Sequence, residues 1–183
     1  MPRINPIDLD TAEGKARTLL EGIRKKYGRI PNLLATLAQA PAALDAYLGL
    51  GQALGGGSLD AGLREQIAVA VAGANGCGYC ASAHTAIGTS VGIDAGELEA
   101  NLRGEATESR TQAALDFALE IVEKRGWASD DDLQRVRDAG FSDGEITEIV
   151  ANVVANIFSN YFNHVAQTEI DFPVVEVGTP ASA

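Results

Sequence analysis

The chain has 183 residues, a formal net charge of -11 and a pI of about 4.5, and 46% of its residues are hydrophobic. This length suggests one domain, or a domain with two similar halves, with enough apolar side chains to build a core. The acidic charge argues against nucleic-acid binding, because a phosphate backbone would repel such a surface.

The distribution of apolar residues and cysteines argues against a membrane-spanning protein and against a secreted disulfide scaffold. The longest apolar run, 67–74, is far shorter than the ~20 residues that span a bilayer, and the N-terminus lacks the charged-then-apolar pattern of a signal peptide. The two cysteines are three positions apart, unlike the dispersed cysteines of secreted disulfide scaffolds. We therefore expect a soluble, cytoplasmic protein with no membrane partner, whose cysteines serve redox chemistry or a metal.

Residues 1–55 are predicted to form N-terminal helices. Asp10 and Thr11 can cap a first helix that runs to about Tyr27. Prolines at positions 31 and 41 suit the first turns of two further helices, the second ending at about position 54. The glycine-rich run 55–58 is the clearest break in the chain.

Residues 56–104 are predicted to form a helical core around the cysteines. A helix over 61–74 is capped by Asp60 and ends at Asn75-Gly76. A new helix begins near Cys77 and runs to about position 91, and Asp94 opens a short helix that ends near position 103.

Residues 105–170 are predicted to form a C-terminal helical half. It contains a helix opened by Thr107, one capped by Ser129 and a last, long one from 143 to about 167, capped by Ser142. Residues 171–183 have the character of an extended tail that docks on this subunit or on a neighbour. No segment alternates with a period of two, and Ala and Leu dominate, so we predict an all-α fold in a single domain.

The two halves of the chain weakly resemble each other. Segments 60–72 and 143–155 each begin with an acidic cap, carry a Glu five residues later and continue as an apolar helix. In this alignment Glu65 matches Glu148, and the cysteines match Asn160 and Asn163, so only the first half has thiols. Two ordinary capped helices would give the same pattern, which leaves duplication open.

The residues that can carry chemistry lie between positions 64 and 84. Cys77 and Cys80 are three positions apart, which on a helix places their Cα atoms ~5 Å apart, within the range of a disulfide. Both lie in a predicted first helical turn, whose free N–H groups favour a thiolate. His84 follows Cys80 by four residues and points back toward it, so it can accept the thiol proton. We infer that Cys80 attacks and Cys77 resolves.

Glu65 is the odd residue on an otherwise apolar helix. It can orient His84 or relay a proton if the two helices pack together, but spacing alone slightly favours a solvated residue that pairs with Arg64 or with nothing. A zinc site made of both cysteines, His84 and Glu65 is the rival to redox chemistry, although structural zinc sites usually pair two such clusters. Buried, inert thiols are the third alternative. Redox chemistry without a metal or cofactor is the favoured interpretation.

Three further side chains are assigned structural roles. Tyr79 and Trp127 are predicted to be packing residues, the second at a helix junction. His164 has no cysteine nearby in the sequence, and we expect a hydrogen-bonded core or interface residue there.

The chain resembles a known family pattern at four positions. These are Glu65, the Cys-x-x-Cys pair that begins twelve residues later, and His84, which lies four residues past the second Cys. The pattern is that of the AhpD-like alkylhydroperoxidase branch of the carboxymuconolactone decarboxylase family. The segment 160–175, with its Asp-Phe-Pro, is similar to the peroxidase-related members. The resemblance implies an all-helical fold that assembles as trimers or hexamers. It also implies that Cys80 attacks, Cys77 resolves, and His84 and Glu65 form a proton relay.

The resemblance further implies an antioxidant thiol peroxidase that reduces organic hydroperoxides without a cofactor. A dithiol, either a lipoyl group on a carrier protein or a peroxiredoxin system, would restore the thiols. The alternatives are a disulfide reductase for a peroxiredoxin, a lactone decarboxylase and a structural metal-binding oligomer. Decarboxylase members generally lack the cysteine pair, which disfavours the second alternative. In one departure, the best-studied member has a histidine that contributes to activity where this chain has Tyr79.

Overall fold

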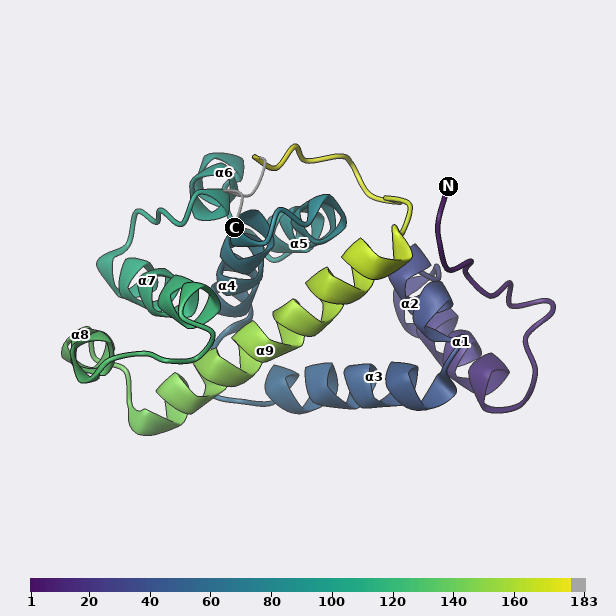
Figure 1. The fold of residues 1–183 in the computed structure, drawn as a ribbon, viewed down its shortest axis with the longest axis horizontal. Helices are drawn as coiled ribbons and strands as arrows, with labels where there is room; N and C mark the ends of the chain where they lie inside the picture. Colours follow the sequence, from purple (N-terminus) through teal and green to yellow (C-terminus); the bar gives the residue numbers. More distant parts are fainter. Residues whose placement is uncertain (179–183) are drawn as a thin grey trace.

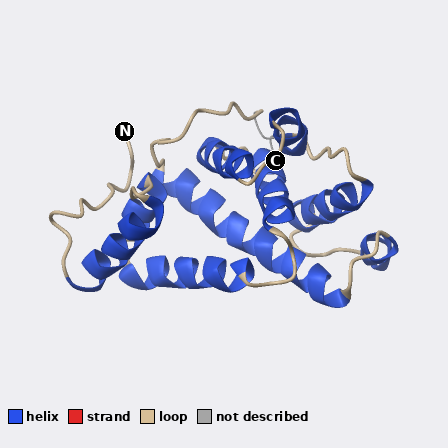
Figure 2. Cartoon of the chain, turned by 180° about the vertical axis from the view of Figure 1, so that it is seen from behind, coloured by secondary structure: helices blue, strands red, loops and turns tan. Residues whose placement is uncertain are grey.

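The computed structural model describes residues 1–178, which form nine helices joined by loops, with no strand (Figures 1 and 2). The all-α prediction is therefore confirmed. The last residues of the predicted tail, 179–183, lie outside the described part. The helices are α1 (Gly14–Tyr27), α2 (Asn32–Leu37), α3 (Pro41–Gly55), α4 (Ala61–Ala74), α5 (Gly78–Ser90), α6 (Ala95–Leu102), α7 (Ser109–Glu123), α8 (Asp130–Asp138) and α9 (Asp143–Ala166).

Four helices, α4, α6, α8 and α9, begin at the capping side chain predicted for them. The Asp60 carboxylate accepts a hydrogen bond from the Leu63 N–H, and Ser129 and Ser142 each form a capping box. Helix α7 begins differently from the prediction, because Glu108 caps it by accepting from the Thr111 N–H. Thr107 does not cap it, since its hydroxyl donates to Glu97.

The start of the first helix is also predicted wrongly. Helix α1 begins at Gly14, after the Asp10 and Thr11 that we expected to cap it. Both residues are held instead in a separate turn around Asp8. The Asp8 carboxylate accepts from the Asp10 N–H, and the Asp8 carbonyl accepts from the Thr11 N–H and hydroxyl. Local side-chain bonding of this kind competes with helix formation.

Helix α4 is the centre of the molecule and contacts α5, α6, α7 and α9. Its residues 67–72 are all buried, as expected for a helix that is apolar on every side. Helix α9 crosses the molecule diagonally, with α3 running beside it (Figure 1). Helices α1 and α2 lie at the end of the molecule opposite α7 and α8, and α3 runs from that end toward the middle (Figure 1).

Two apolar clusters hold these elements together. One packs α4 against α7, α8 and α9, with Ile67, Leu115 and Val136 among its fully buried members. The other joins α1 and α2 to the start of α5, and it contains both cysteines. The cysteine pair therefore lies where the N-terminal helices meet the α4–α5 hairpin.

The described part of the tail docks on its own chain. The Asp171 carboxylate accepts hydrogen bonds from the Tyr79 hydroxyl at 2.8 Å, the Asn32 N–H at 3.1 Å and Arg29 at 3.0 Å. Further along, the Val175 N–H donates to the Ser82 hydroxyl at 3.0 Å. Of the two destinations predicted for the tail, the same subunit is the one observed for these residues.

Two structural roles predicted from the sequence are wrong in part or whole. Trp127 is 85% exposed, so it is no packing residue. His164 is exposed on α9, where its ring stacks on Tyr161 with centroids 6.5 Å apart, and it is not part of the core. An interface role for His164 stays a prediction.

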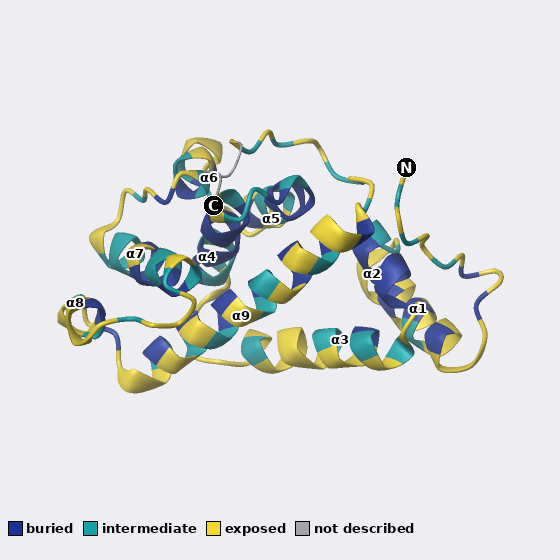
Figure 3. Cartoon of the chain, viewed as in Figure 1, coloured by how far each residue is buried: buried dark blue, intermediate teal, exposed yellow. Residues whose placement is uncertain are grey.

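Helix α9 has exposed positions along its length (Figure 3), and several of the residues at these positions are apolar. They recur every three or four residues along one side, at Val150, Val154, Phe158, Tyr161 and Val165. The trimer or hexamer implied by the family resemblance stays a prediction. No helix in residues 1–178 is long and apolar enough to cross a membrane.

Gly73 marks the closest approach of α4 to the end of α6. A Cβ at this position would lie 2.1 Å from the Leu102 carbonyl oxygen, which is backbone and cannot rotate away. We expect Gly73→Ala to lower the free energy of unfolding by about 1–3 kcal/mol in urea denaturation, because it forces the two helices apart. Gly49→Ala in α3 is the matched control, since a Cβ there meets nothing within 4 Å. Equal stabilities of the two variants would contradict this packing.

Candidate active site

The cysteine pair sits at the turn between α4 and α5. Gly76 adopts a φ of +64°, a left-handed conformation that suits glycine and lets the chain reverse direction. Cys77 follows as the N-cap residue of α5, and Cys80 lies in the first turn of that helix. Both thiols are free and buried, with residue exposures of 1% and 2%. The predicted position at a helix start is confirmed.

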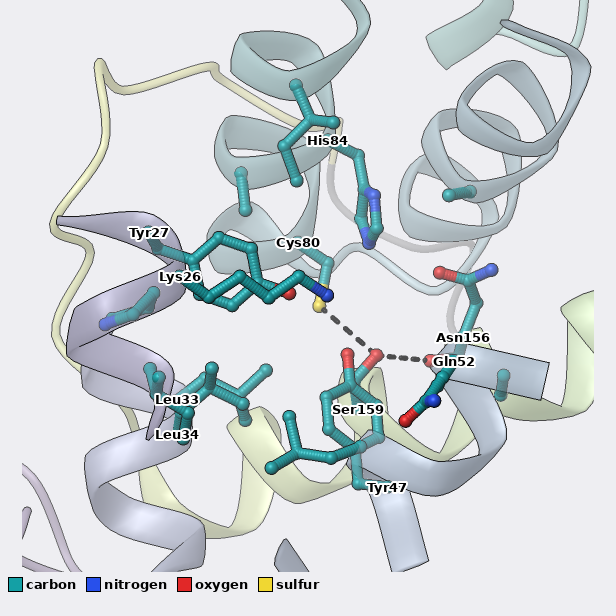
Figure 4. Close-up of a pocket in the computed structure, with 18 of the residues that line it drawn as sticks. Lys26, Tyr27, Leu33, Leu34, Tyr47, Gln52, Cys80, His84, Asn156 and Ser159 are labelled. Carbon is teal, nitrogen blue, oxygen red and sulfur yellow. Dashed lines mark hydrogen bonds between the residues drawn. The ribbon is translucent and has the colours of Figure 1, made fainter. Parts of the chain in front are cut away.

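The Cys80 sulfur has polar partners from α9 as well as from its own helix. The Asn163 side-chain amide donates to it at 3.2 Å, and the Ser159 hydroxyl oxygen lies 4.0 Å away (Figure 4). The hydrogen bond from the Cys77 thiol, the charge on His84 and these α9 groups outweigh burial and lower the pKa of Cys80 to about 6. A large fraction of Cys80 is therefore thiolate at neutral pH.

The other member of the pair has the opposite electrostatics. The hydrogen bond that Cys77 shares with Cys80, together with burial, raises the pKa of Cys77 well above its ordinary value. Cys77 thus stays protonated and can donate to the neighbouring thiolate. One sulfur is suited to nucleophilic attack and the other to a later step.

His84 and Glu65 are brought together by the packing of α4 against α5. The Glu65 Oε2 lies 2.7 Å from His84 Nδ1, and both side chains are 19% exposed. Burial opposes a charge on the imidazole, but the Glu65 carboxylate and Cys80 outweigh it and raise the pKa of His84. Spacing alone slightly favoured a solvated Glu65 that pairs with Arg64 or with nothing, and this expectation is wrong. The imidazole points into the space beside Cys80 (Figure 4).

A zinc site is not assembled by these residues. Within residues 1–178, no three His, Cys, Asp or Glu side chains are grouped closely enough to hold a metal ion. Glu65 and His84 bind each other instead of converging on the two sulfurs.

A cavity of about 820 Å³ opens directly onto Cys80 (Figure 4). Its walls come from α1, α2, α3, α4, α5 and α9, and Glu65 and His84 are also part of its lining. Leu33 and Leu34 of α2 form part of its apolar wall, whereas Lys26 of α1 adds a positive charge (Figure 4). The cavity is large enough for an organic molecule of considerable size.

The α9 groups beside Cys80 were not predicted from the sequence. Five buried polar residues lie along this helix, each three or four positions from at least one other: Asn152, Asn156, Ser159, Asn160 and Asn163. A buried polar stripe at helical spacing was the available signal. Asn163 is also the residue that the internal alignment matches with Cys80.

Tyr47 of α3 is a second missed residue of the cavity wall. Burial and the nearby Cys80 charge raise the pKa of Tyr47 to about 12, so its phenol stays protonated. It lies beside Ser159, whose hydroxyl donates to the Asn156 carbonyl at 3.0 Å (Figure 4). A neutral hydroxyl can donate a hydrogen bond to a ligand in the cavity.

Tyr79, between the two cysteines, is buried, as the packing role predicted. It also makes two hydrogen bonds, accepting from the Leu33 N–H at 3.0 Å and donating to Asp171 at 2.8 Å. Its ring meets Phe172 edge to face, with centroids 5.8 Å apart. Tyr79 therefore connects the cysteine turn to α2 and to the tail.

Comparisons with known proteins agree with this arrangement. Residues 41–124, which contain Glu65, both cysteines and His84, match the carboxymuconolactone decarboxylase family. The fold is similar to an uncharacterised peroxidase-related protein from Ralstonia eutropha with an alkylhydroperoxidase AhpD core, at a TM-score of 0.82 and 28% identity over 93% of this chain and 92% of that one. A search among curated proteins finds no match.

Two further solved structures share the fold. One is an uncharacterised peroxidase-related protein from a Silicibacter species, with a TM-score of 0.79 and 25% identity over 91% of this chain and 92% of that one. The other is the debrominase Bmp8, a variant of which was solved with 2,3,4-tribromopyrrole. It has a TM-score of 0.77 and 21% identity over 92% of this chain and 91% of that one, which shows the fold alone. Residues 41–124 are therefore similar to the carboxymuconolactone decarboxylase family, and the fold is similar to that of peroxidase-related proteins, one of which has an AhpD core.

Proposed function

We propose that this protein is a cofactor-free peroxidase that reduces organic hydroperoxides with the Cys77–Cys80 dithiol. One observation carries the proposal: a cysteine with a pKa lowered to about 6 faces a large cavity beside an ion-paired histidine. Perturbed ionisation in a cavity is a recognised sign of a reactive group. The peroxidase-related structural neighbours support the same chemistry.

The first step is attack of the Cys80 thiolate on the hydroperoxide. A sulfur–oxygen bond forms and the O–O bond breaks, so that Cys80 becomes a sulfenic acid and the hydroperoxide becomes an alkoxide. The His84 imidazolium gives its proton to the alkoxide, which leaves as an alcohol. Glu65 holds the imidazole through Nδ1 and stabilises its charged form before the transfer.

The second step joins the two cysteines. The Cys77 sulfur attacks the Cys80 sulfenic acid, a disulfide forms, and the hydroxyl group leaves as water with the Cys77 proton. Cys77 precedes the first helical residue, and Gly76 and Gly78 flank it, so it can move toward Cys80 without unwinding α5. A dithiol donor then reduces the disulfide by exchange.

The cavity favours a bulky substrate that is mainly apolar. Its volume of about 820 Å³ greatly exceeds what hydrogen peroxide needs, and leucines and aromatic rings make up much of its wall. Cys80 is only 2% exposed, so a disulfide on a folded protein would have to leave its own surface to reach the sulfur. This burial favours an organic hydroperoxide over the peroxiredoxin-reductase alternative.

The test is a single-turnover reaction of the pre-reduced protein with cumene hydroperoxide. We expect each chain to consume one equivalent, to lose both thiols and to form a Cys77–Cys80 disulfide in the peptide map. Hydrogen peroxide is expected to react more slowly, because it gains nothing from the apolar wall. Retention of both thiols after excess cumene hydroperoxide would overturn the proposal.

A further inference from the structure

The two cysteines open onto different cavities. Cys80 lines the large cavity described above, whereas Cys77 lines a separate, shallower pocket of about 320 Å³. The second pocket lies between the start of α5, the end of α9 and the residues that follow α9, among them Ile170. Tyr79 lines both cavities and separates them. The pair of sulfurs can therefore be reached from two directions.

The second pocket carries unused hydrogen-bonding groups. Asn163 Oδ1 and Thr168 Oγ1 belong to residues that line it, and neither buried atom has a hydrogen-bond partner within residues 1–178. Asn163 is 4% exposed, and its nitrogen already donates to Cys80, which leaves the oxygen for another donor. Buried polar atoms in native proteins are normally satisfied, so a ligand with an N–H donor fits this pocket.

We propose that a thiol reductant with an amide group on its chain enters the second pocket and attacks Cys77, while the hydroperoxide uses the large cavity at Cys80. This inference rests on the proposed peroxidase function, because it assigns the step that regenerates the thiols. The small volume suits an extended chain that carries the thiol, not a folded domain. Oxidant and reductant would then never compete for one entrance.

The exchange chemistry agrees with this direction of attack. The reductant thiolate forms a bond to the Cys77 sulfur, the Cys77–Cys80 bond breaks, and Cys80 leaves as a thiolate. Cys80 is the better leaving group, because the charge on His84 and the hydrogen-bonding groups of Asn163 and Ser159 also lower its pKa, and they remain in place when Cys77 is bonded to the reductant. The second thiol of the reductant then attacks the mixed disulfide, Cys77 leaves and takes a proton, and the reductant departs as a disulfide.

The direct test identifies which sulfur receives the reductant. The wild-type disulfide, prepared with diamide so that no peroxide is needed, is mixed briefly with N-acetylcysteamine, quenched in acid and alkylated with N-ethylmaleimide. We expect the mixed disulfide on Cys77 and the maleimide on Cys80 in fragment-ion spectra. Adducts on Cys80, or equal amounts on both cysteines, would overturn the proposal. Because diamide replaces the hydroperoxide, failure of the peroxidase function would be seen separately.

Two matched variants test the separate entrances. Ile170→Trp narrows the second pocket, and Ile87→Trp narrows the large cavity. We expect Ile170→Trp to slow reduction of the disulfide by N-acetylcysteamine about 10-fold and to spare cumene hydroperoxide consumption by the pre-reduced protein. Ile87→Trp is expected to do the reverse. If both variants slow the same half-reaction, the two-entrance arrangement is wrong, and normal peroxide consumption by Ile170→Trp shows that this variant is folded.

Discussion

Cys80→Ser is expected to abolish consumption of cumene hydroperoxide, whereas Cys77→Ser is expected to consume one equivalent and stop. The two substitutions are chemically identical and lie three residues apart, so each is the control for the other. Serine at position 80 leaves no thiolate to attack the O–O bond. Serine at position 77 leaves the attack intact but removes the thiol that resolves the sulfenic acid, which dimedone labelling and mass spectrometry would detect at Cys80.

The pH dependence of alkylation tests the basis of this difference. The Cys80 thiolate forms as the pH rises through about 6, so iodoacetamide should react with a midpoint near that pH instead of near 9. The Cys77 thiol is the largest cause of the lowered pKa. Cys77→Ala should therefore move the midpoint upward, while Cys77→Ser, which keeps a hydroxyl donor, should move it less. A wild-type midpoint near 9 would contradict the assignment of Cys80 as the nucleophile.

His84→Asn is expected to slow the peroxide step by about 10²- to 10⁴-fold, the range for loss of a general acid or base. Asparagine keeps a polar side chain of similar reach but cannot deliver a proton to the alkoxide. Glu65→Gln should have a smaller effect on the rate and a distinct effect on its pH profile. The measurement is stopped-flow consumption of cumene hydroperoxide by the pre-reduced variants between pH 5 and 9.

The direction of the change in the pH profile follows from the Glu65–His84 ion pair. The Glu65 carboxylate raises the pKa of His84, so the imidazolium persists to higher pH than in a free histidine and is lost as the pH rises through that raised value. Glu65→Gln removes the carboxylate, and the alkaline limb of the profile should move to lower pH. Glu99→Gln, an exposed carboxylate on α6, is the matched control and should change nothing. An unmoved limb in Glu65→Gln would mean that Glu65 only supports the packing.

Features that depend on short stretches of sequence were predictable. The α4–α5 hairpin follows from the Asp60 cap, the apolar run after it and the Asn75-Gly76 break, all of which act within a few residues. The placement of both cysteines at the start of α5 follows from the same signals. The helix starts predicted at Asp10 and Thr107 were wrong because Asp8 holds Asp10 in a separate turn and Glu97, ten residues away, accepts from the Thr107 hydroxyl.

Contacts between distant segments were beyond a single sequence. Asn163 is 83 positions from Cys80, and the hydrogen bond between them exists only because α9 folds across α5. The Tyr79–Asp171 bond joins residues 92 positions apart, so the anchoring of the tail could not be derived from either segment. The contact between Glu65 and His84 likewise could not be predicted from their spacing in the sequence, because it depends on how two helices pack.

The reacting side chains and the apolar wall at α2 come from different parts of the chain. The sulfurs, Glu65 and His84 all fall within residues 41–124, the part shared with the family, while α1 and α2 precede it and α9 follows it. The apolar wall at Leu33 and Leu34 can therefore diverge freely without disturbing proton transfer between His84 and Cys80. A chimera that exchanges only residues 1–40 with those of a relative should inherit a new preference for hydroperoxide shape while retaining the same titration of its nucleophile.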